Sequence, residues 1–500
     1  MSDKKKEILK QAGIYSVATQ IAQAITIIAS ICSRRFLGPT QTGIWATLQI
    51  IVDYSKYTTL GIMAAVSREI PYAIGKKDPA RAQKIQNVAF SFVTSTSVLF
   101  ALAVFIFSLV SWGRFRPEIS YGLCLVSVLV FMQRFNNLLV ALLRSRKKFE
   151  IETELMVLSA IVNAALVAGL TYYFQIFGFI CALIGSLGFN IAYIFFRNDF
   201  KFRYDMDRSE LKPLLSFGLP LMALGGMTTI FKSLDEIMVV RLLGFEQLGY
   251  YSIAVMVFSY MTNFTASCAI ILLPHFQEKF GKTDNPKEMA NYLLKSIQAY
   301  ALIVPVFIGG VWLFAPFFIH WFLPNFEPGL APMKILVFNM FFVSVVQTPQ
   351  DFLMTIKKHW VLFPILAGSI ALSALLDYWA VKAGYGIMGV AAATLTVFFL
   401  NFTAVFFAAA RFAVDRLTAI KRYLGWISMC AYNMLILWAL DKWGGLENFD
   451  FFQTVRCAFI FVLAYMPFLW LLEKDFVVFT ILRTWIRKRK SQNKPANPKP

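Results

Sequence analysis

Apolar residues follow one another along this chain in long runs that are separated by short polar segments. Each run is close to the length of about 20 residues that a helix needs to cross ~30 Å of hydrocarbon. Helices satisfy their own backbone hydrogen bonds in lipid, so the pattern predicts an all-α integral membrane protein. We predict fourteen transmembrane helices, at approximately residues 11–33, 42–65, 84–111, 119–142, 155–174, 177–196, 213–240, 247–273, 291–319, 331–355, 360–381, 386–410, 423–441 and 451–472.

The composition agrees with this class. The residues AVILMFWYC make up 58% of the 500-residue chain and DEKR only 15%, against roughly 25% charged residues in a soluble domain. The first apolar run resembles a signal peptide, but it is too long and carries Gln11, Gln20 and Gln23. It is therefore interpreted as the first transmembrane helix.

The net charge of +20 at first suggests a nucleic-acid-binding protein. Its distribution argues otherwise. With the N-terminus placed in the cytoplasm, 36 of the 48 Lys and Arg residues fall on the cytoplasmic side and 8 on the outer side. This alternation follows the positive-inside rule and predicts a multi-pass protein of the cytoplasmic (inner) membrane, with both termini in the cytoplasm. Membrane lipids then become the expected partner and nucleic acid does not.

Residues typical of metal or nucleotide chemistry are scattered. The six cysteines occur singly and the three histidines lie far apart, so no disulfide framework or metal site is predicted. The segment Gly281-Lys282-Thr283 resembles the end of a phosphate-binding loop, but Phe276 stands where that loop needs glycine. The sequence therefore predicts no ATPase, no cofactor and no catalytic residues, and the protein is not expected to be an enzyme.

An internal repeat divides the chain. The segments Arg35-Phe-Leu-Gly-Pro-Thr-Gln-Thr-Gly-Ile-Trp45 and Arg241-Leu-Leu-Gly-Phe-Glu-Gln-Leu-Gly-Tyr-Tyr251 agree at five of eleven positions, at an offset of 206. Six predicted spans separate the copies, so the two halves have the same orientation and are expected to be related by an axis along the membrane normal. We predict a six-helix lobe at 1–200, a second at 201–411, two additional helices at 412–473, and a basic cytoplasmic tail at 474–500.

Two six-helix lobes that each carry an R-x-L-G-x-x-Q-x-G turn resemble the multidrug/oligosaccharidyl-lipid/polysaccharide (MOP) exporter superfamily. The stretch GIYSVATQIAQAITIIASICSRRFLGPTQTGIW is similar to its polysaccharide transport branch, the Wzx-type flippases. The resemblance implies a central cavity and alternating access. It also implies a polyprenyl-pyrophosphate-linked oligosaccharide as the substrate, moved across the membrane for cell-surface polysaccharide assembly, and partners in the assembly machinery.

Basic residues inside the predicted spans are candidates for substrate binding, because intramembrane charge is usually functional. Lys56, Arg134 and Lys232 would neutralise a pyrophosphate. Arg134 is the strongest candidate, since its own span holds no acid and guanidinium suits bidentate phosphate recognition. For Lys56, pairing with Asp53 three residues earlier is an equally good interpretation.

Acidic and polar residues of the spans have two interpretations each. Asp53, Asp235 and Glu236 are candidates for binding a coupling proton or cation, or for a static ion network with the bases. Thr19, Gln20 and Gln23 belong to one polar stripe of the first span, which either lines a hydrated cavity or makes hydrogen bonds between helices.

Two other functions remain open. An ion-coupled multidrug antiporter of the same superfamily typically carries a carboxylate in its first span, and this chain has no acid between Glu7 and Asp53. A membrane enzyme of polysaccharide assembly would need a sizeable outer loop with acids or histidines, and the outer connections are short.

Overall fold

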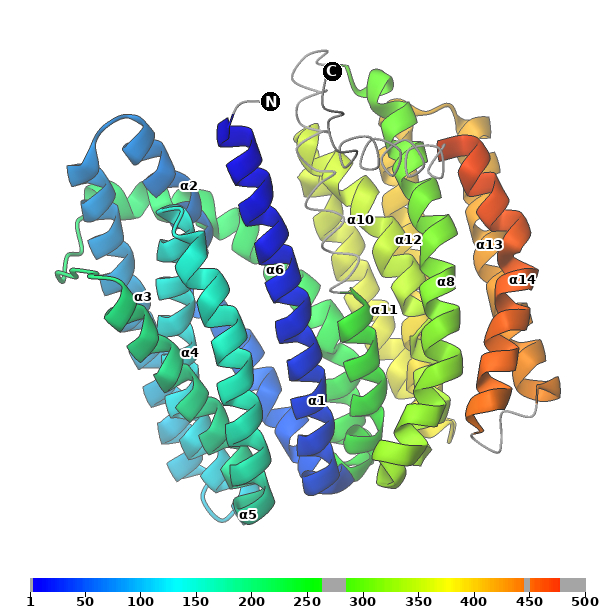
Figure 1. Cartoon of the computed structure of the whole chain (residues 1–500), viewed down its shortest axis with the longest axis horizontal. Helices are drawn as coiled ribbons and strands as arrows, with labels where there is room; N and C mark the ends of the chain where they lie inside the picture. Colours follow the sequence, from blue (N-terminus) through cyan, green and yellow to red (C-terminus); the bar gives the residue numbers. More distant parts are fainter. Residues whose placement is uncertain (1–2, 263–284, 445–449, 477–500) are drawn as a thin grey trace, which may run out of the picture. The chain divides into compact units, whose positions relative to one another are not determined.

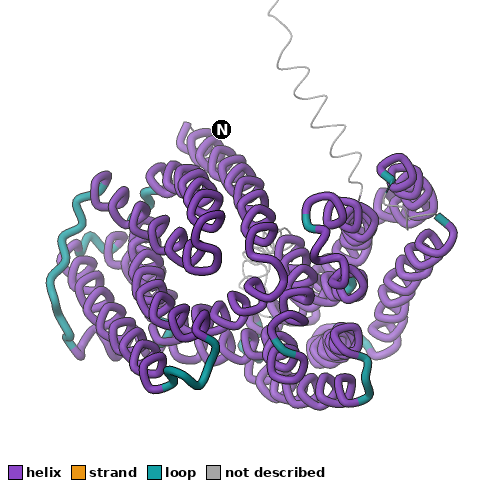
Figure 2. Tube along the Cα trace, turned by 90° about the horizontal axis from the view of Figure 1, so that it is seen from below, coloured by secondary structure: helices purple, strands orange, loops and turns teal. Residues whose placement is uncertain are grey.

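The structure is a computed structural model, and it describes residues 3–262, 285–444 and 450–476. Every regular element in these residues is a helix, joined to the next by a short connection (Figure 2). The predicted all-α fold is therefore confirmed. The basic tail at 474–500 lies almost wholly outside the described residues.

The helices follow one another with few residues between them (Figure 1). Residues 245–262 are also helical. The bounds of the other helices are α1 (Asp3–Tyr54), η1 (Ser55–Thr59), α2 (Ile62–Gly75), α3 (Pro79–Val110), α4 (Pro117–Ser145), α5 (Phe149–Arg197), α6 (Arg208–Leu243), η2 (Pro286–Met289), α8 (Ala290–Phe322), η3 (Pro324–Gly329), α9 (Leu330–Leu336), α10 (Asn339–Thr355), η4 (His359–Val361), α11 (Leu362–Lys382), α12 (Gly386–Ala413), α13 (Arg416–Trp443) and α14 (Phe451–Phe476).

Eleven helical segments of the described chain are long and apolar enough to cross a membrane. Two of them hold two predicted spans each, because α1 reverses direction at Gly38 and α5 at Gln175, where the backbone leaves helical geometry. The eighth predicted span begins in the helix at 245–262 and ends outside the described residues. Each of the fourteen predicted spans thus has helical residues, although the second and the tenth are interrupted.

The repeated turn has the same backbone in both copies. Gly38 has φ 67° and ψ 179°, and Gly244 has φ 90° and ψ 179°, a region that is essentially restricted to glycine. The two turns also touch each other. A Cβ on Gly43 would lie 1.7 Å from the carbonyl oxygen of Phe245, and one on Gly249 would lie 1.9 Å from that of Pro39. The offset of 206 relates both the two glycines and the two carbonyls, so the contact is symmetric.

A second repeated turn was not visible in the sequence comparison. Lys147 follows α4 and Lys357 follows α10, and both adopt the left-handed conformation at φ 59°. In each case the N–H of the next lysine returns to a carbonyl five residues back, as in a Schellman ending. The turns occupy equivalent places after the fourth and tenth spans.

The chain forms two compact units. The first comprises residues 1–253, 322–329 and 370–390, and the second comprises 254–321, 330–369 and 391–500. Within the first, α5 packs along α1 and α4, α3 packs along α4, and α2 contacts α3, α4 and α6. The lobe boundaries predicted from the sequence stay a prediction.

In the second unit, α13 and α14 are bonded to α8 at buried polar positions. Trp426 Nε1 donates to Gln298 Oε1 at 2.6 Å, and Asn433 Nδ2 donates to the carbonyl of Pro305 at 3.1 Å. Tyr465 of α14 donates to another α8 carbonyl at 3.2 Å. These bonds fix the two additional helices to a helix of the repeat.

The first unit has two hydrophobic cores, one above the other along the helices. One is built around Ile44, Leu48, Val52 and Val130, and the other around residues such as Leu138. Between the two cores, α4 carries Gln133, Arg134, Asn136 and Asn137, and most residues of the second span are also polar. A polar layer therefore crosses the middle of this unit.

Candidate functional site

The second span is interrupted in this polar layer. After Tyr54 the chain forms the 3-10 turn Ser55–Thr59, and then Leu60 and Gly61 both have left-handed φ angles, 47° and 77°. The helix resumes as α2 at Ile62. A Cβ on Gly61 would lie 2.2 Å from the backbone of Gly218 on α6, so glycine is required for the approach as well as for the conformation.

Arg134 lies on α4 in the same layer. Its side chain is 6% exposed, and its Nε has no hydrogen-bond partner among the described residues. The neighbouring side chains of Gln133 and Asn136 also have an oxygen without a partner in the described chain. Buried polar groups without partners are costly, so this layer is arranged for something other than stability alone.

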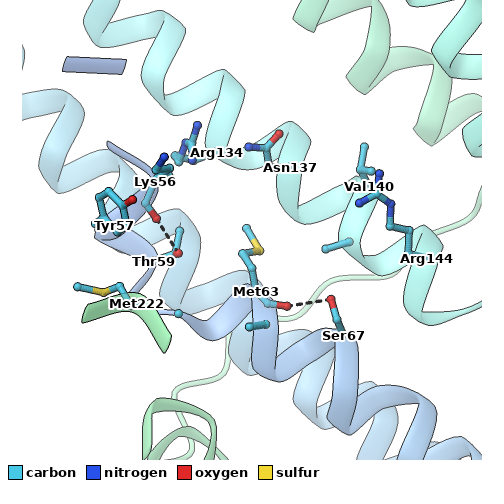
Figure 3. A pocket seen from close by; sticks show the side chains of 13 residues that line it. Lys56, Tyr57, Thr59, Met63, Ser67, Arg134, Asn137, Val140, Arg144 and Met222 are labelled. Atoms are coloured by element: carbon cyan, nitrogen blue, oxygen red, sulfur yellow. Dashed lines mark hydrogen bonds between the residues drawn. The ribbon is translucent and has the colours of Figure 1, made fainter. Parts of the chain in front are cut away.

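A cavity of about 600 Å³ joins the interrupted span to α4. Figure 3 shows Lys56 beside Arg134 at one end of it, with Arg144 farther along α4. Three of the lining residues are basic and none is acidic. The full lining consists of Lys56, Tyr57, Thr59, Gly61, Met63, Ala64, Ser67, Arg134, Asn137, Val140, Ala141, Arg144 and Met222.

The charges of this cavity are not equally neutralised. Arg144 is bonded to Glu152 of α5, from Nε at 2.8 Å, and Tyr15 of α1 donates to the same carboxylate at 3.1 Å. Lys56 lies 5.1 Å from the centre of the Tyr57 ring. Asp53 is within electrostatic range of Lys56 and Arg134 but does not line the cavity. The end of the cavity that is lined by Lys56 and Arg134, called the inner end below, therefore keeps a positive potential.

Lys232, the third predicted base, lies outside the lining of this cavity. Its side chain is exposed, and it is near enough to Lys56 for the two charges to repel each other. The two elements that carry these lysines are joined by tyrosines. Tyr57 donates to the carbonyl of Gly225 at 2.8 Å, and the hydroxyls of Tyr54 and Ser233 are 2.9 Å apart. The structure thus brings together Lys56 and Arg134 directly and places Lys232 nearby.

The predicted acidic residues lie in a connected group. Asp235 accepts a hydrogen bond from Tyr251 at 2.6 Å, and Glu236 is within electrostatic range of Asp53 and Asp235. The structure adds Asp377 of α11, which is fully buried, interacts electrostatically with Asp235, and accepts a hydrogen bond from Ser373. The contacts of Asp235 are to a tyrosine hydroxyl and a backbone N–H.

The three polar residues of α1 that were predicted to line a cavity lie outside the cavity described above. Thr19 is half-buried and bonds to the carbonyl of Tyr15 at 2.8 Å and to the sulfur of Met156 at 3.4 Å. Gln20 is exposed and Gln23 half-buried. None of these three lines the cavity between the second span and α4. Their place on a transport path stays a prediction.

Arg144, Asn137 and Asp377 are candidate site residues that the sequence reasoning did not select. Asn137 and Arg144 follow Arg134 at intervals of three and ten residues, which places all three on one face of α4. That spacing could have identified them. Asp377 had no such signal, because only tertiary packing brings α11 beside Asp235.

A family model described as "Polysaccharide biosynthesis protein" matches residues 33–326, more than half of the chain. The chain belongs to this family. The match covers both copies of the repeated turn and all three predicted bases. No curated protein matches the chain in sequence.

Solved structures of MOP exporters have the same fold. A structure described as lipid II flippase MurJ in an inward closed conformation has a TM-score of 0.66 at 14% identity, covering 93% of this chain and 99% of that one. An inward-facing multidrug transporter of the MATE family has a TM-score of 0.64 at 14% identity, covering 80% and 98%. An outward-facing MATE transporter has a TM-score of 0.58 at 16% identity, covering 83% and 96%. This chain is thus a multi-pass membrane protein of MOP exporter fold.

Proposed function

We propose that this protein is a flippase that translocates a polyprenyl-pyrophosphate-linked oligosaccharide across the cytoplasmic membrane by alternating access. The coarser statement, a membrane flippase or exporter of the polysaccharide biosynthesis family, follows from the family match and the fold. The observation that carries the finer proposal is the cavity of the first unit. It is lined by three bases and no acid, so its charge suits an anion.

Lys56 and Arg134 take the pyrophosphate at the inner end of the cavity, and Lys232 adds positive potential close to Lys56. Guanidinium donates two parallel hydrogen bonds to phosphate, whereas ammonium acts as a point charge. The sugars would occupy the hydrated space around these bases, and the polyprenyl chain would remain in lipid. The reaction is binding and release with no covalent step.

The proposed orientation places both termini in the cytoplasm, in accord with the distribution of Lys and Arg. Arg144 is bonded to Glu152, which also accepts a hydrogen bond from Tyr15 in the first part of α1, so the cavity extends from the middle of the first unit toward the N-terminal side. In the proposed orientation that is the side on which the substrate arrives. Other proteins of polysaccharide assembly would supply the substrate and consume the product.

The acidic group of the first unit is the proposed coupling site. Asp53, Asp235, Glu236 and Asp377 gather several carboxylates within a few helices. Like charges at short distance favour the uptake of a proton or a cation. Binding there would let an ion gradient drive the return of the empty carrier.

Reconstitution into liposomes with a fluorescent lipid-linked oligosaccharide tests the proposal. Flipping is read as the fraction of fluorophore that becomes inaccessible to a quencher outside, with and without imposed proton and sodium gradients. Arg134→Glu should abolish flipping, and Arg134→Lys should retain part of it, because the charge remains while the bidentate geometry is lost. Full activity of Arg134→Glu would exclude the proposed site.

A multidrug antiporter is the second candidate, because MATE transporters share the fold. The basic cavity argues against cationic drugs. Efflux of cationic dyes from cells expressing the protein, in the absence of flipping in liposomes, would favour this function. Elongation of glycans by the purified protein would instead indicate an enzyme.

A further inference from the structure

The interruption of the second predicted span places a helix N-terminus at the cavity of the first unit. The helix α2 is 14 residues long and begins at Ile62, directly after the two left-handed residues. The first N–H groups of any helix have no acceptor within it, and the helix dipole adds a partial positive charge at that end. Only the N–H groups of Ala64 and Ala65 return to the carbonyl of Gly61. The start of α2 can therefore donate hydrogen bonds to an anion.

A second feature of the same cavity points to an anionic ligand. Gly61, Met63 and Ala64 of the α2 start line the cavity together with Arg134. Only 6% of the surface of Arg134 is exposed, and its Nε has no hydrogen-bond partner among the described residues. A buried guanidinium with a free donor is costly unless an anion binds to it. Lys56, on the turn itself, supplies another positive charge.

We propose that the interrupted second span is a backbone cradle for the pyrophosphate group, in which the first-turn N–H groups of α2 bind one phosphoryl group and Arg134 with Lys56 binds the other. This inference deepens the proposed function and rests on it for the nature of the ligand. It explains why the span is broken where it is, because a continuous helix would bond these N–H groups internally. It also explains the left-handed Leu60 and Gly61, which turn the start of α2 toward the cavity.

Ala64 is the position at which to test the cradle. It is exposed, lines the cavity, and is the third residue of α2. Glutamate is favourable at this position of a helix, so Ala64→Glu should fold while its carboxylate occupies the donors. Ala64→Gln has the same shape without the charge. Ser67→Glu places the same charge in the same cavity one turn farther along α2.

Binding of farnesyl pyrophosphate to the full chain in phosphatidylcholine nanodiscs measures the effect. We expect Ala64→Glu to weaken binding at least about tenfold, which corresponds to ~1.4 kcal/mol. We expect Ala64→Gln to bind within about threefold of the unchanged protein, and Ser67→Glu to be affected less than Ala64→Glu. Equal losses for the two glutamate variants would mean simple repulsion and would overturn the cradle.

Three further binding measurements identify the chemical class of the ligand. Inorganic pyrophosphate should compete, and farnesyl monophosphate should bind more weakly, because one phosphoryl group leaves half of the cradle unused. Nanodiscs containing phosphatidylglycerol should not prevent binding; if they do, the site takes lipid headgroups and the proposal is wrong. Absence of farnesyl pyrophosphate binding alongside normal flipping would refute the cradle and leave the flippase standing, and the converse result would refute only the flippase.

Discussion

At the scale of single residues, position within the polar layer decides what a charged side chain can do. Arg134 and Arg144 lie on one face of α4, yet Arg144 is bonded to Glu152 while Arg134 is buried with a free donor. Two buried acids differ in a related way. Asp351 and Asp377 each accept a hydrogen bond from a side chain four residues away, but Asp377 is also within electrostatic range of the carboxylate of Asp235. Local pairing indicates a structural role, and an uncompensated charge indicates a functional one.

We expect Asp377→Asn to abolish stimulation of flipping by an ion gradient, because the variant cannot exchange a proton or cation. Flipping without a gradient should persist, since the basic cavity is untouched. Asp351→Asn is the matched control, because Asp351 is equally buried and locally bonded. Gradient-driven and gradient-free rates in liposomes provide the measurement. An unchanged gradient response in Asp377→Asn would remove Asp377 from the coupling site.

Asp207, which caps α6 outside the membrane spans, gives a pH dependence of known sign. Bonding to Lys84, together with the N–H of Ser209, lowers the pKa of its carboxyl to about 2. An unfolded aspartate has a pKa of about 3.9. The stabilisation is therefore complete above about pH 4 and is lost as the pH falls toward 2.

The expected outcome is that Asp207→Asn, which keeps a capping oxygen but loses the charge, is less stable than the unchanged protein near neutral pH. The difference should shrink on acidification below about pH 4. Thermal unfolding in detergent as a function of pH measures it. A difference that is independent of pH would contradict the assignment.

At the scale of elements, glycines decide where helices break and where they touch. Gly38 needs its conformation but has open space around it, whereas Gly43 is helical but presses on the backbone of Phe245. Gly61 needs both. The consequences are a reversal of the chain at Gly38, a symmetric contact between the repeated turns, and an interruption of the second span in the polar layer.

We predict that Gly38→Ala and Gly43→Ala are both destabilising, for different reasons. The first forces alanine into a glycine-only region, at a cost of about 1–3 kcal/mol. The second puts a Cβ 1.7 Å from an oxygen and must separate the two repeated turns. Gly169→Ala in the interior of α5 has open space and should be neutral or stabilising by about 0.5–1 kcal/mol.

Thermal unfolding of the three glycine variants compares them. Only Gly43→Ala should also increase labelling of a cysteine introduced beside the turn, such as Gln41→Cys, relative to the same cysteine in the unchanged background. Equal labelling in all backgrounds would show that the two turns remain in contact.

At the scale of the whole molecule, the two additional helices are part of the packing of the second unit. They hydrogen-bond to polar groups of α8, namely the side chain of Gln298 and the carbonyl of Pro305. The MurJ structure covers 93% of the chain and the MATE structures cover 80–83%.

A chain ending at Val414 should therefore express poorly and unfold at a lower temperature than the full chain. Trp426→Phe tests the same contact more gently, because it leaves the buried Gln298 amide unpaired at a cost of about 1–3 kcal/mol. Trp438→Phe, at an exposed position of α13, is the control. A truncated chain as stable as the full one would show that the two helices are merely appended.

The sequence by itself determined the all-helical membrane class and the repeated turn, while its orientation and its basic site stay predictions. Hydrophobic runs and glycine spacing are local properties, and the bilayer converts hydrophobic runs directly into helices. It also selected Lys56 and Arg134, because charge inside an apolar run is conspicuous. Only the tertiary structure decided which charges are already paired, that Lys232 lies outside the cavity, and that Asp377 joins Asp235. It also decided that the second span is interrupted from Ser55 to Gly61, because the backbone approach of Gly61 to Gly218 is a long-range contact.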